Sequence, residues 1–166
     1  HGEALLSSLY KENKDLKIFS VAGPKMRSTG VECILQTEEF SVMGFVDVFL
    51  SLPKIARNFY FLAKQILQKE PKTVVFIDYP GFALRQERYL RKKGFKGKIV
   101  HYICPSVWAH GKGRVPLMEK NLDLLLTIFP FEKKYFSSSL PVAYVGHPLV
   151  QRIQDYSPSQ IGRAHV

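Results

Sequence analysis

Apolar residues along this chain alternate between short β-rich runs and longer segments with helical spacing. The β-rich runs predict strands at 16–22, 31–35, 73–77, 98–103, 122–129 and 142–145. The helical spacing predicts helices at the amino terminus and over 24–30, 45–52, 53–67, 82–93 and 115–121. Pro53 is expected to start or kink the helix that follows it, because proline cannot donate a backbone hydrogen bond.

Strands that alternate with helices predict an α/β fold, here a Rossmann-like parallel sheet with helices on both faces. The continuous apolar run Thr73–Ile77 is typical of a strand buried on both faces of such a sheet. With 166 residues the chain fits one domain, which we place at 1–160. Residues 161–166 resemble a translated sequencing adapter and are interpreted as an artefact, and the helical pattern already under way at His1 predicts further residues upstream.

Composition and charge narrow the class of protein. Hydrophobic residues make up 46% and charged residues 23%, which excludes wholesale disorder and a disulfide-stapled miniprotein. The net charge of +10 is concentrated in residues 54–98, which hold 12 basic and 3 acidic residues, and it favours nucleic acid, a phosphorylated ligand or an anionic membrane as partner. Cys33 and Cys104 lack CxxC spacing and are predicted to be buried thiols in a reducing compartment.

Several motif classes are missing from the sequence. The histidines and cysteines show no HExxH, HxxxH or CxxC spacing, so no metal site is predicted. A Walker loop, a GxSxG elbow and a GxGxxG loop are also missing, and we expect no cofactor. No aromatic pattern or finger spacing typical of nucleic-acid binding accompanies the charge, so nucleic acid is not an expected partner.

Polar residues that follow the predicted strands are the candidate site, because open parallel sheets bind ligands beyond the carboxyl ends of their strands. Asp78 could act as a general base or cap the next helix. Ser106 could cap a turn or donate to a ligand, and Trp108 could be core or a ligand platform. His147 could donate a proton, contact phosphate or bridge structure, and the Met43-Gly44 loop could simply plug the core.

Six segments, in this order, resemble the lipid-A-disaccharide synthases, which are glycosyltransferases of the two-Rossmann-domain (GT-B) type. They are Ala22–Met26, Glu38–Gly44, Ile77–Pro80, His101–Ala109, Ile128–Glu132 and Val145–Pro148. The resemblance implies a hexosyltransferase that joins UDP-2,3-diacylglucosamine to 2,3-diacylglucosamine 1-phosphate, releasing UDP. It also implies that this chain is the N-terminal, acceptor-side half, that the C-terminal UDP-binding domain lies outside it, and that the fragment alone is inactive.

The resemblance also assigns roles to individual residues. It implies that Asp78 is the catalytic base and that Ser106, Trp108, Arg114 and His147 bind substrate. It places the membrane and acyl-chain contact at Met43, Gly44, Phe45, Val46 and Phe49, beside the basic residues Lys54, Arg57 and Lys64.

The location that the resemblance implies is the cytoplasm, peripheral on the anionic inner membrane. Two alternatives stay open. One is a non-catalytic basic module that binds anionic lipid or nucleic acid, and the other is a different nucleotide-sugar glycosyltransferase.

Overall fold

The computed structural model describes residues 1–39, 45–109 and 111–150, with only the backbone described over 45–51. The chain divides into two compact units. Unit 1 comprises His1–Pro71 and Tyr89–Lys96, and unit 2 comprises Lys72–Arg88 and Gly97–Val166. The single domain over 1–160 and the artefactual tail at 161–166 stay predictions.

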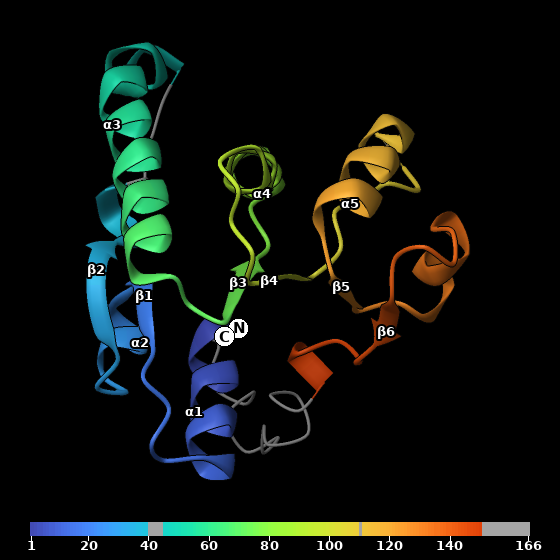
Figure 1. Cartoon of the computed structure of the whole chain (residues 1–166), viewed down its shortest axis with the longest axis horizontal. Helices are drawn as coiled ribbons and strands as arrows, with labels where there is room; N and C mark the ends of the chain where they lie inside the picture. The colour runs from blue at the N-terminus through green and yellow to red at the C-terminus, as the bar shows by residue number, and fades with distance from the viewer. Residues whose placement is uncertain (40–44, 110, 151–166) are drawn as a thin grey trace, which may run out of the picture. The chain divides into compact units, whose positions relative to one another are not determined.

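Unit 1 contains a two-stranded parallel sheet and, among the residues described before Pro71, three α-helices (Figure 1). Its small core joins Leu6, Ala22 and Val31, so the apolar side of the first helix packs on the first strand. Its elements are α1 (Gly2–Glu12), β1 (Phe19–Ala22), α2 (Pro24–Arg27), β2 (Glu32–Gln36), the 3-10 turn η1 (Thr37–Glu39) and α3 (Phe45–Lys69).

Helix α3 runs without a break through Pro53. The alternative in which Pro53 starts a separate helix is therefore wrong, and the two helical segments expected around it are one element. Leu62, Ala63 and Ile66 are buried, which follows the spacing of three and four residues expected for one apolar face. Burial of that face compensates for the backbone hydrogen bond that proline cannot donate.

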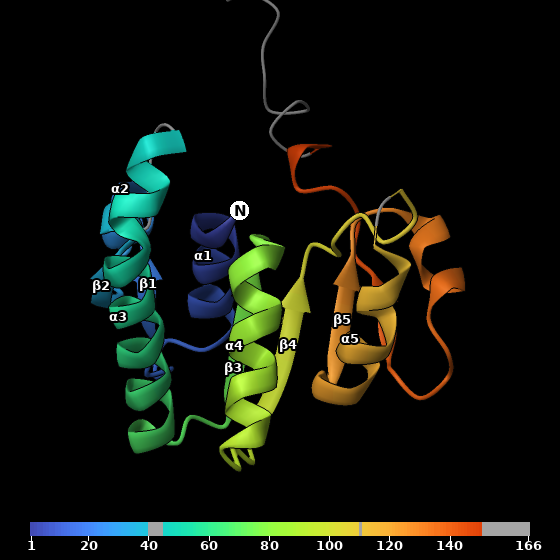
Figure 2. The ribbon, with the colours of Figure 1, turned by 90° about the horizontal axis from the view of Figure 1, so that it is seen from above.

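Unit 2 contains a four-stranded sheet in the order β3-β4-β5-β6, with every neighbouring pair parallel. Figures 1 and 2 show α4 and α5 on the same face of this sheet. The elements are β3 (Thr73–Ile77), α4 (Pro80–Lys92, whose last four residues belong to unit 1), β4 (Lys98–Tyr102), η2 (Lys112–Arg114), α5 (Val115–Asn121), β5 (Leu124–Thr127), η3 (Pro130–Tyr135) and β6 (Val142–Tyr144).

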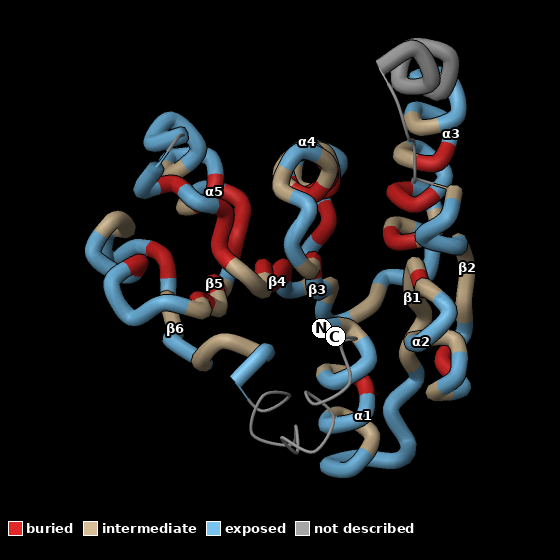
Figure 3. The backbone as a smooth tube through the Cα atoms, turned by 180° about the vertical axis from the view of Figure 1, so that it is seen from behind, coloured by how far each residue is buried: buried red, intermediate tan, exposed pale blue. Residues whose placement is uncertain are grey.

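Burial in unit 2 is deepest on β4 and on the sides of α4 and α5 that face the sheet (Figure 3). Three consecutive β4 residues are buried, Ile99, Val100 and His101, so both faces of that strand are covered. The expectation that β3 is buried on both faces was wrong. Only Phe76 on β3 is buried and Val75 is 39% exposed, because β3 is an edge strand of this sheet and only one of its faces is covered within the unit.

The fold class predicted from the sequence is confirmed. The chain is an α/β protein whose strands pair in parallel, and the predicted bounds of β3 and α5 match those observed. The register Ile77↔Tyr102 and Tyr102↔Leu126 brings the carboxyl ends of β3, β4 and β5 to one edge. A helix layer on the second face of the sheet stays a prediction.

Candidate functional site

The carboxyl edge of the unit 2 sheet collects most of the residues singled out from the sequence. In Figure 2 the arrows of β4 and β5 point the same way, and the segments that follow them leave from this edge. Asp78 follows β3, Ser106 and Trp108 follow β4, and His147 follows β6. Because ligands of open parallel sheets bind at this edge, we treat it as the candidate site.

The backbone at the ends of β3 and β4 takes a conformation that is rare for residues with side chains. Asp78 and Tyr79 have φ values of 54° and 51°, and Ile103 has φ 72°. A left-handed conformation is unusual for any non-glycine residue and most of all for a β-branched one. The Asp78 N–H donates to the carbonyl of Tyr102 over 2.9 Å, so the aspartate is fixed to the sheet while the chain turns away. Such conformations concentrate at functional sites.

The Asp78 carboxylate is exposed to solvent. It follows a strand of the sheet, but it lies at the surface of unit 2 and is not buried with that strand. Within the described residues this carboxylate accepts no hydrogen bond, and α4 begins at Pro80, so Tyr79 and not Asp78 stands at the N-cap position. The capping role thus has no support in this part of the chain, and the carboxylate is open to an incoming group.

The segment after β4 exposes a serine and a tryptophan on either side of a buried valine. Val107 is fully buried and anchors the loop, while Ser106 is exposed and Trp108 is 42% exposed. Of the two alternatives for Trp108, the surface platform agrees with this exposure and the core does not. Arg114 is exposed, and its side chain lies against Gly111, where an added Cβ would meet Arg114 Cδ at 3.2 Å.

Four rings form a continuous row along this edge. Trp108 meets Phe131 edge-on at 5.7 Å, Phe131 stacks on Phe129 at 5.5 Å, and Phe129 meets His147 at 5.9 Å between ring centroids. We call Trp108, Phe131, Phe129 and His147 the aromatic row. Phe129 and Phe131 lie in the segment Ile128–Glu132 that carries the family resemblance, but no role was predicted for them from the sequence. Two aromatics flanking a proline directly after a strand were the signal that could have found them.

The buried carboxylate of Glu132 fixes the backbone of the aromatic row at Phe129. Glu132 is 1% exposed and accepts a hydrogen bond from the Phe129 N–H over 3.1 Å. Burial raises the pKa of Glu132, and the N–H groups of Phe129 and Ile128 oppose that rise. Burial, with the nearby Glu132 charge, raises the pKa of Cys104 to about 12, so this thiol stays protonated.

His147 has a defined hydrogen-bonding role. Its Nδ1 accepts from the Leu149 N–H over 3.2 Å, so the proton of the neutral ring sits on Nε2, which we infer from this contact. The ring therefore offers a donor, as a phosphate contact requires. Among the described residues, ring contacts link His147 to Trp108, whereas no hydrogen bond or ring contact joins Asp78, Ser106 or Arg114 to them.

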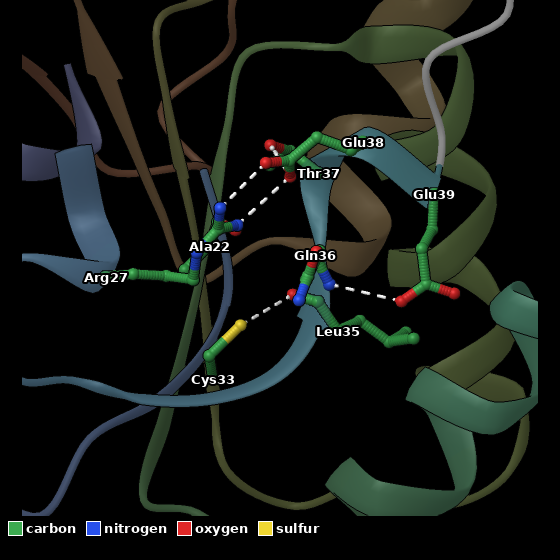
Figure 4. A network of polar contacts seen from close by, with 8 residues as sticks. All are labelled: Ala22, Arg27, Cys33, Leu35, Gln36, Thr37, Glu38 and Glu39. Carbon is green, nitrogen blue, oxygen red and sulfur yellow. Dashed lines mark hydrogen bonds and ion pairs between the residues drawn. The ribbon is translucent and has the colours of Figure 1, made fainter. Parts of the chain in front are cut away.

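In unit 1 the carboxyl ends of β1 and β2 are joined by an ion pair (Figure 4). Arg27 donates to both oxygens of Glu38, over 2.8 and 3.1 Å, and to the carbonyl of Ala22 over 2.9 Å. The Arg27 hydrogen bond holds the pKa of Glu38 at about 2. Arg27 thus connects Ala22 and Glu38, which belong to two of the segments that carry the family resemblance.

The expected membrane-contact residues fall largely outside what the structure describes. Met43 and Gly44 lie beyond the described residues, and the side chains of Phe45, Val46 and Phe49 are likewise not described. Further along α3, the exposed residues Lys54, Arg57, Phe61 and Lys64 follow one another at helical spacing, with Phe61 40% exposed. This stretch is an amphipathic, basic helix surface, which we call the α3 stripe.

The part of the chain that the structure describes has neither a cluster of metal ligands nor a membrane-spanning helix. There, no three His, Cys, Asp or Glu side chains come together as metal ligands. None of the described helices is long and apolar enough to cross a membrane.

Comparison with known proteins decides the family. A family profile described as lipid-A-disaccharide synthetase matches residues 1–166. The chain belongs to the lipid-A-disaccharide synthetase family. It is 44% identical over 156 residues to the lipid-A-disaccharide synthase of Chlamydia pneumoniae and 35% identical over 155 residues to that of Geobacter sulfurreducens. The resemblance inferred from the six sequence segments is confirmed.

The family relationship covers nearly all of this chain but only part of its relatives. The matched residues are 93% of the chain in both comparisons, and they are 26% of the Chlamydia pneumoniae protein and 40% of the Geobacter sulfurreducens protein. The synthase of Chlamydia trachomatis serovar D gives the same picture, with 43% identity over 95% of this chain and 26% of the relative. Statements about the activity of the whole protein are accordingly proposals.

Proposed function

We propose that this chain is the acceptor-side part of a GT-B glycosyltransferase that makes lipid A disaccharide. The reaction joins UDP-2,3-diacylglucosamine to 2,3-diacylglucosamine 1-phosphate and releases UDP. Membership of the lipid-A-disaccharide synthetase family over residues 1–166 carries the proposal. The placement of Asp78, Ser106, Trp108 and His147 along one carboxyl edge supports it, because this edge is where such sheets bind ligands.

In this proposal Asp78 is the general base. The 6-hydroxyl oxygen of the acceptor attacks the anomeric carbon of the donor, the bond from that carbon to UDP breaks, and Asp78 takes the hydroxyl proton. Its exposed carboxylate, without a hydrogen-bond partner in the described part of the chain, is free to meet the hydroxyl. A positioned base accelerates such a step by about 10²–10⁴-fold.

Substrate binding is proposed for Ser106, Trp108, Arg114 and His147. A guanidinium and an imidazole N–H suit the acceptor phosphate, since charge-assisted hydrogen bonds to phosphate are strong. The Nε2 donor on His147 and the exposed Arg114 side chain are consistent with this role.

The test of the base is Asp78→Asn in the full-length protein, assayed by mass spectrometry of the disaccharide product. We expect kcat to fall by about 10²–10⁴-fold with KM little changed, because the amide cannot accept the proton. Asp15→Asn, an exposed aspartate of unit 1, is the matched control and should retain full turnover. A general base should contribute at least about 10²-fold to kcat. If the kcat of Asp78→Asn is within about threefold of the parent value, the assignment of Asp78 as the base is therefore wrong.

We also propose that the α3 stripe attaches the protein to an anionic membrane surface. Its exposed lysines and arginine flank an exposed phenylalanine, and each basic residue at such a surface contributes about 1 kcal/mol. Vesicles with and without phosphatidylglycerol test it by flotation. Arg57→Glu with Lys64→Glu should reduce flotation with anionic vesicles at low salt, while Lys14→Glu, also in unit 1, should not.

These vesicle experiments also address the alternative of a non-catalytic basic module. A module that only binds lipid would float with anionic vesicles, and the full-length parent would form no disaccharide. Vesicle binding by a parent protein that makes no disaccharide would therefore favour the binding module over the enzyme.

A further inference from the structure

The aromatic row is an exposed apolar surface at the candidate site. Trp108 is 42% exposed, Phe131 41% and Phe129 37%. Large apolar side chains that contact one another and stay open to water mark a place where a partner or ligand binds. A purely structural cluster would be buried, as Val107 and Leu125 are in the same unit.

We propose that the aromatic row binds an acyl chain of the lipid-linked sugar substrate, with Phe129 and Phe131 as substrate-contacting residues. This inference rests on the proposed function and names the part of the substrate that this surface takes.

The arrangement of the rings favours an acyl chain over a sugar ring. A pyranose needs an open, flat aromatic face, but Phe129 and Phe131 stack against each other at 15° and Trp108 meets Phe131 at 79°. An acyl chain requires only a continuous apolar surface, since the hydrophobic effect has no preferred direction. Three successive ring contacts supply such a surface along the sheet edge.

The surroundings of the row suit an amphiphile with an anionic head group. Leu149 and Val150 are 42% and 51% exposed and extend the apolar surface beyond His147. Lys133 and Lys134 are exposed in η3, directly after the phenylalanines. An acylated sugar phosphate offers an apolar chain to the first group and a negative charge to the second.

The single tryptophan makes this surface directly measurable, because Trp108 is the only fluorophore of its kind in the 166 residues. We would titrate the whole chain with dihexanoylglucosamine 1-phosphate, glucosamine 1-phosphate and dihexanoyl phosphatidylglycerol, all as monomers in solution. Equilibrium dialysis gives each Kd independently of fluorescence. We expect saturable binding and a blue shift with the acylated sugar phosphate, and binding at least tenfold weaker for the other two ligands.

The variants Phe131→Ala and Phe129→Ala should each weaken binding of the acylated sugar by about tenfold or more. This is the loss expected when a ring that the bound ligand would cover is removed. Phe131→Leu keeps an apolar side chain and should lose less. Leu117→Ala, at a position of similar exposure on α5 (40%), should stay within twofold. Circular dichroism confirms that each variant is folded.

Each outcome has a definite meaning. If the phosphatidylglycerol binds as tightly as the acylated sugar, the row contacts membrane lipid and the proposal is wrong. If both sugar phosphates bind equally well and the phenylalanine variants match the parent, the acyl inference is wrong while the proposed function stands. If neither sugar phosphate binds, the proposed substrate itself is wrong for this chain.

Discussion

The buried pair of His101 and Glu87 gives the sharpest prediction about what holds unit 2 together. His101 lies on β4 and Glu87 on α4, and they are 0% and 1% exposed. Their Nδ1 and Oε1 atoms are 2.5 Å apart, while His101 Nε2 is buried with no partner among the described residues. The pair is thus a polar contact between the central strand and the helix that covers it.

Glu87→Ala removes the acceptor and leaves both ring nitrogens of His101 without a partner in the described part of unit 2. Removing one member of a buried pair lowers the free energy of unfolding by about 3–5 kcal/mol. For a chain of this size that corresponds to a fall in Tm of about 10 °C. Glu87→Gln retains an amide oxygen that can accept from Nδ1–H, so it should lose only about 1–2 kcal/mol.

The assay is urea unfolding followed by circular dichroism. It compares the parent, Glu87→Ala, Glu87→Gln, Glu87→Leu, His101→Leu and the double variant Glu87→Leu/His101→Leu. The double variant should be more stable than His101→Leu alone, because apolar replacement of both partners removes the buried polar groups together. Arg88→Ala, the exposed neighbour on α4, should change the free energy of unfolding by no more than about 0.5 kcal/mol.

Two results would refute this reasoning. One is a loss below about 1 kcal/mol for Glu87→Ala, which would mean that water replaces the contact. The other is a double variant whose loss equals the sum of the single losses, since residues in one hydrogen bond should couple.

Three further predictions concern the ion pair, the thiols and the proline. Glu38 has its pKa lowered to about 2, so the stability it gains over Glu38→Gln should be present above about pH 4.5 and disappear as the pH falls through 2, measured by urea unfolding. Iodoacetamide at pH 8 should modify the half-buried Cys33 before the buried Cys104. With a pKa of about 12, only about one Cys104 side chain in ten thousand is a thiolate at this pH. Peptide mass mapping of the modified protein checks the order of reaction. Pro53→Ala should raise the thermal stability of α3, since alanine restores a helical N–H donor and removes a ring clash of about 3 kcal/mol, measured by circular dichroism. Equal stability of the Pro53→Ala variant and the parent would show that the helix already accommodates the ring.

Much of the fold could be predicted because hydrophobic periodicity reports local structure directly. The run Thr73–Ile77 is a strand with the predicted bounds, and 115–121 is a helix with the predicted bounds. Burial of β3 could not be predicted in the same way. An apolar run looks alike in a central strand and in an edge strand, and its position in the sheet depends on which strands pair with it.

The candidate site was predictable where a polar residue follows a strand. Asp78, Ser106, Trp108 and His147 were found by that rule, and unit 2 places them along one edge. The phenylalanines at 129 and 131 escaped it, because aromatic residues after a strand are read first as core. The structure shows instead that both rings are exposed and stack on each other.

The contact between His101 and Glu87 could not be predicted from the sequence, for a different reason. His101 lies within an apolar strand and Glu87 within a basic helix, and they are 14 residues apart. Nothing in either local pattern requires them to meet. The contact arises because α4 packs on β4, which places a helix carboxylate beside a strand imidazole.

The buried polar pair and the exposed aromatic row occupy different parts of unit 2. His101 and Glu87 lie between the sheet and α4 with almost no exposure, whereas Trp108, Phe131 and Phe129 lie at the carboxyl edge and stay open to water. Glu132 connects the two, since its buried carboxylate accepts from the Phe129 N–H while the Phe129 ring stays exposed at the edge. If the aromatic row binds an acyl chain, as we propose, a packed interior that holds the rings in one arrangement would reduce the ordering entropy lost on binding.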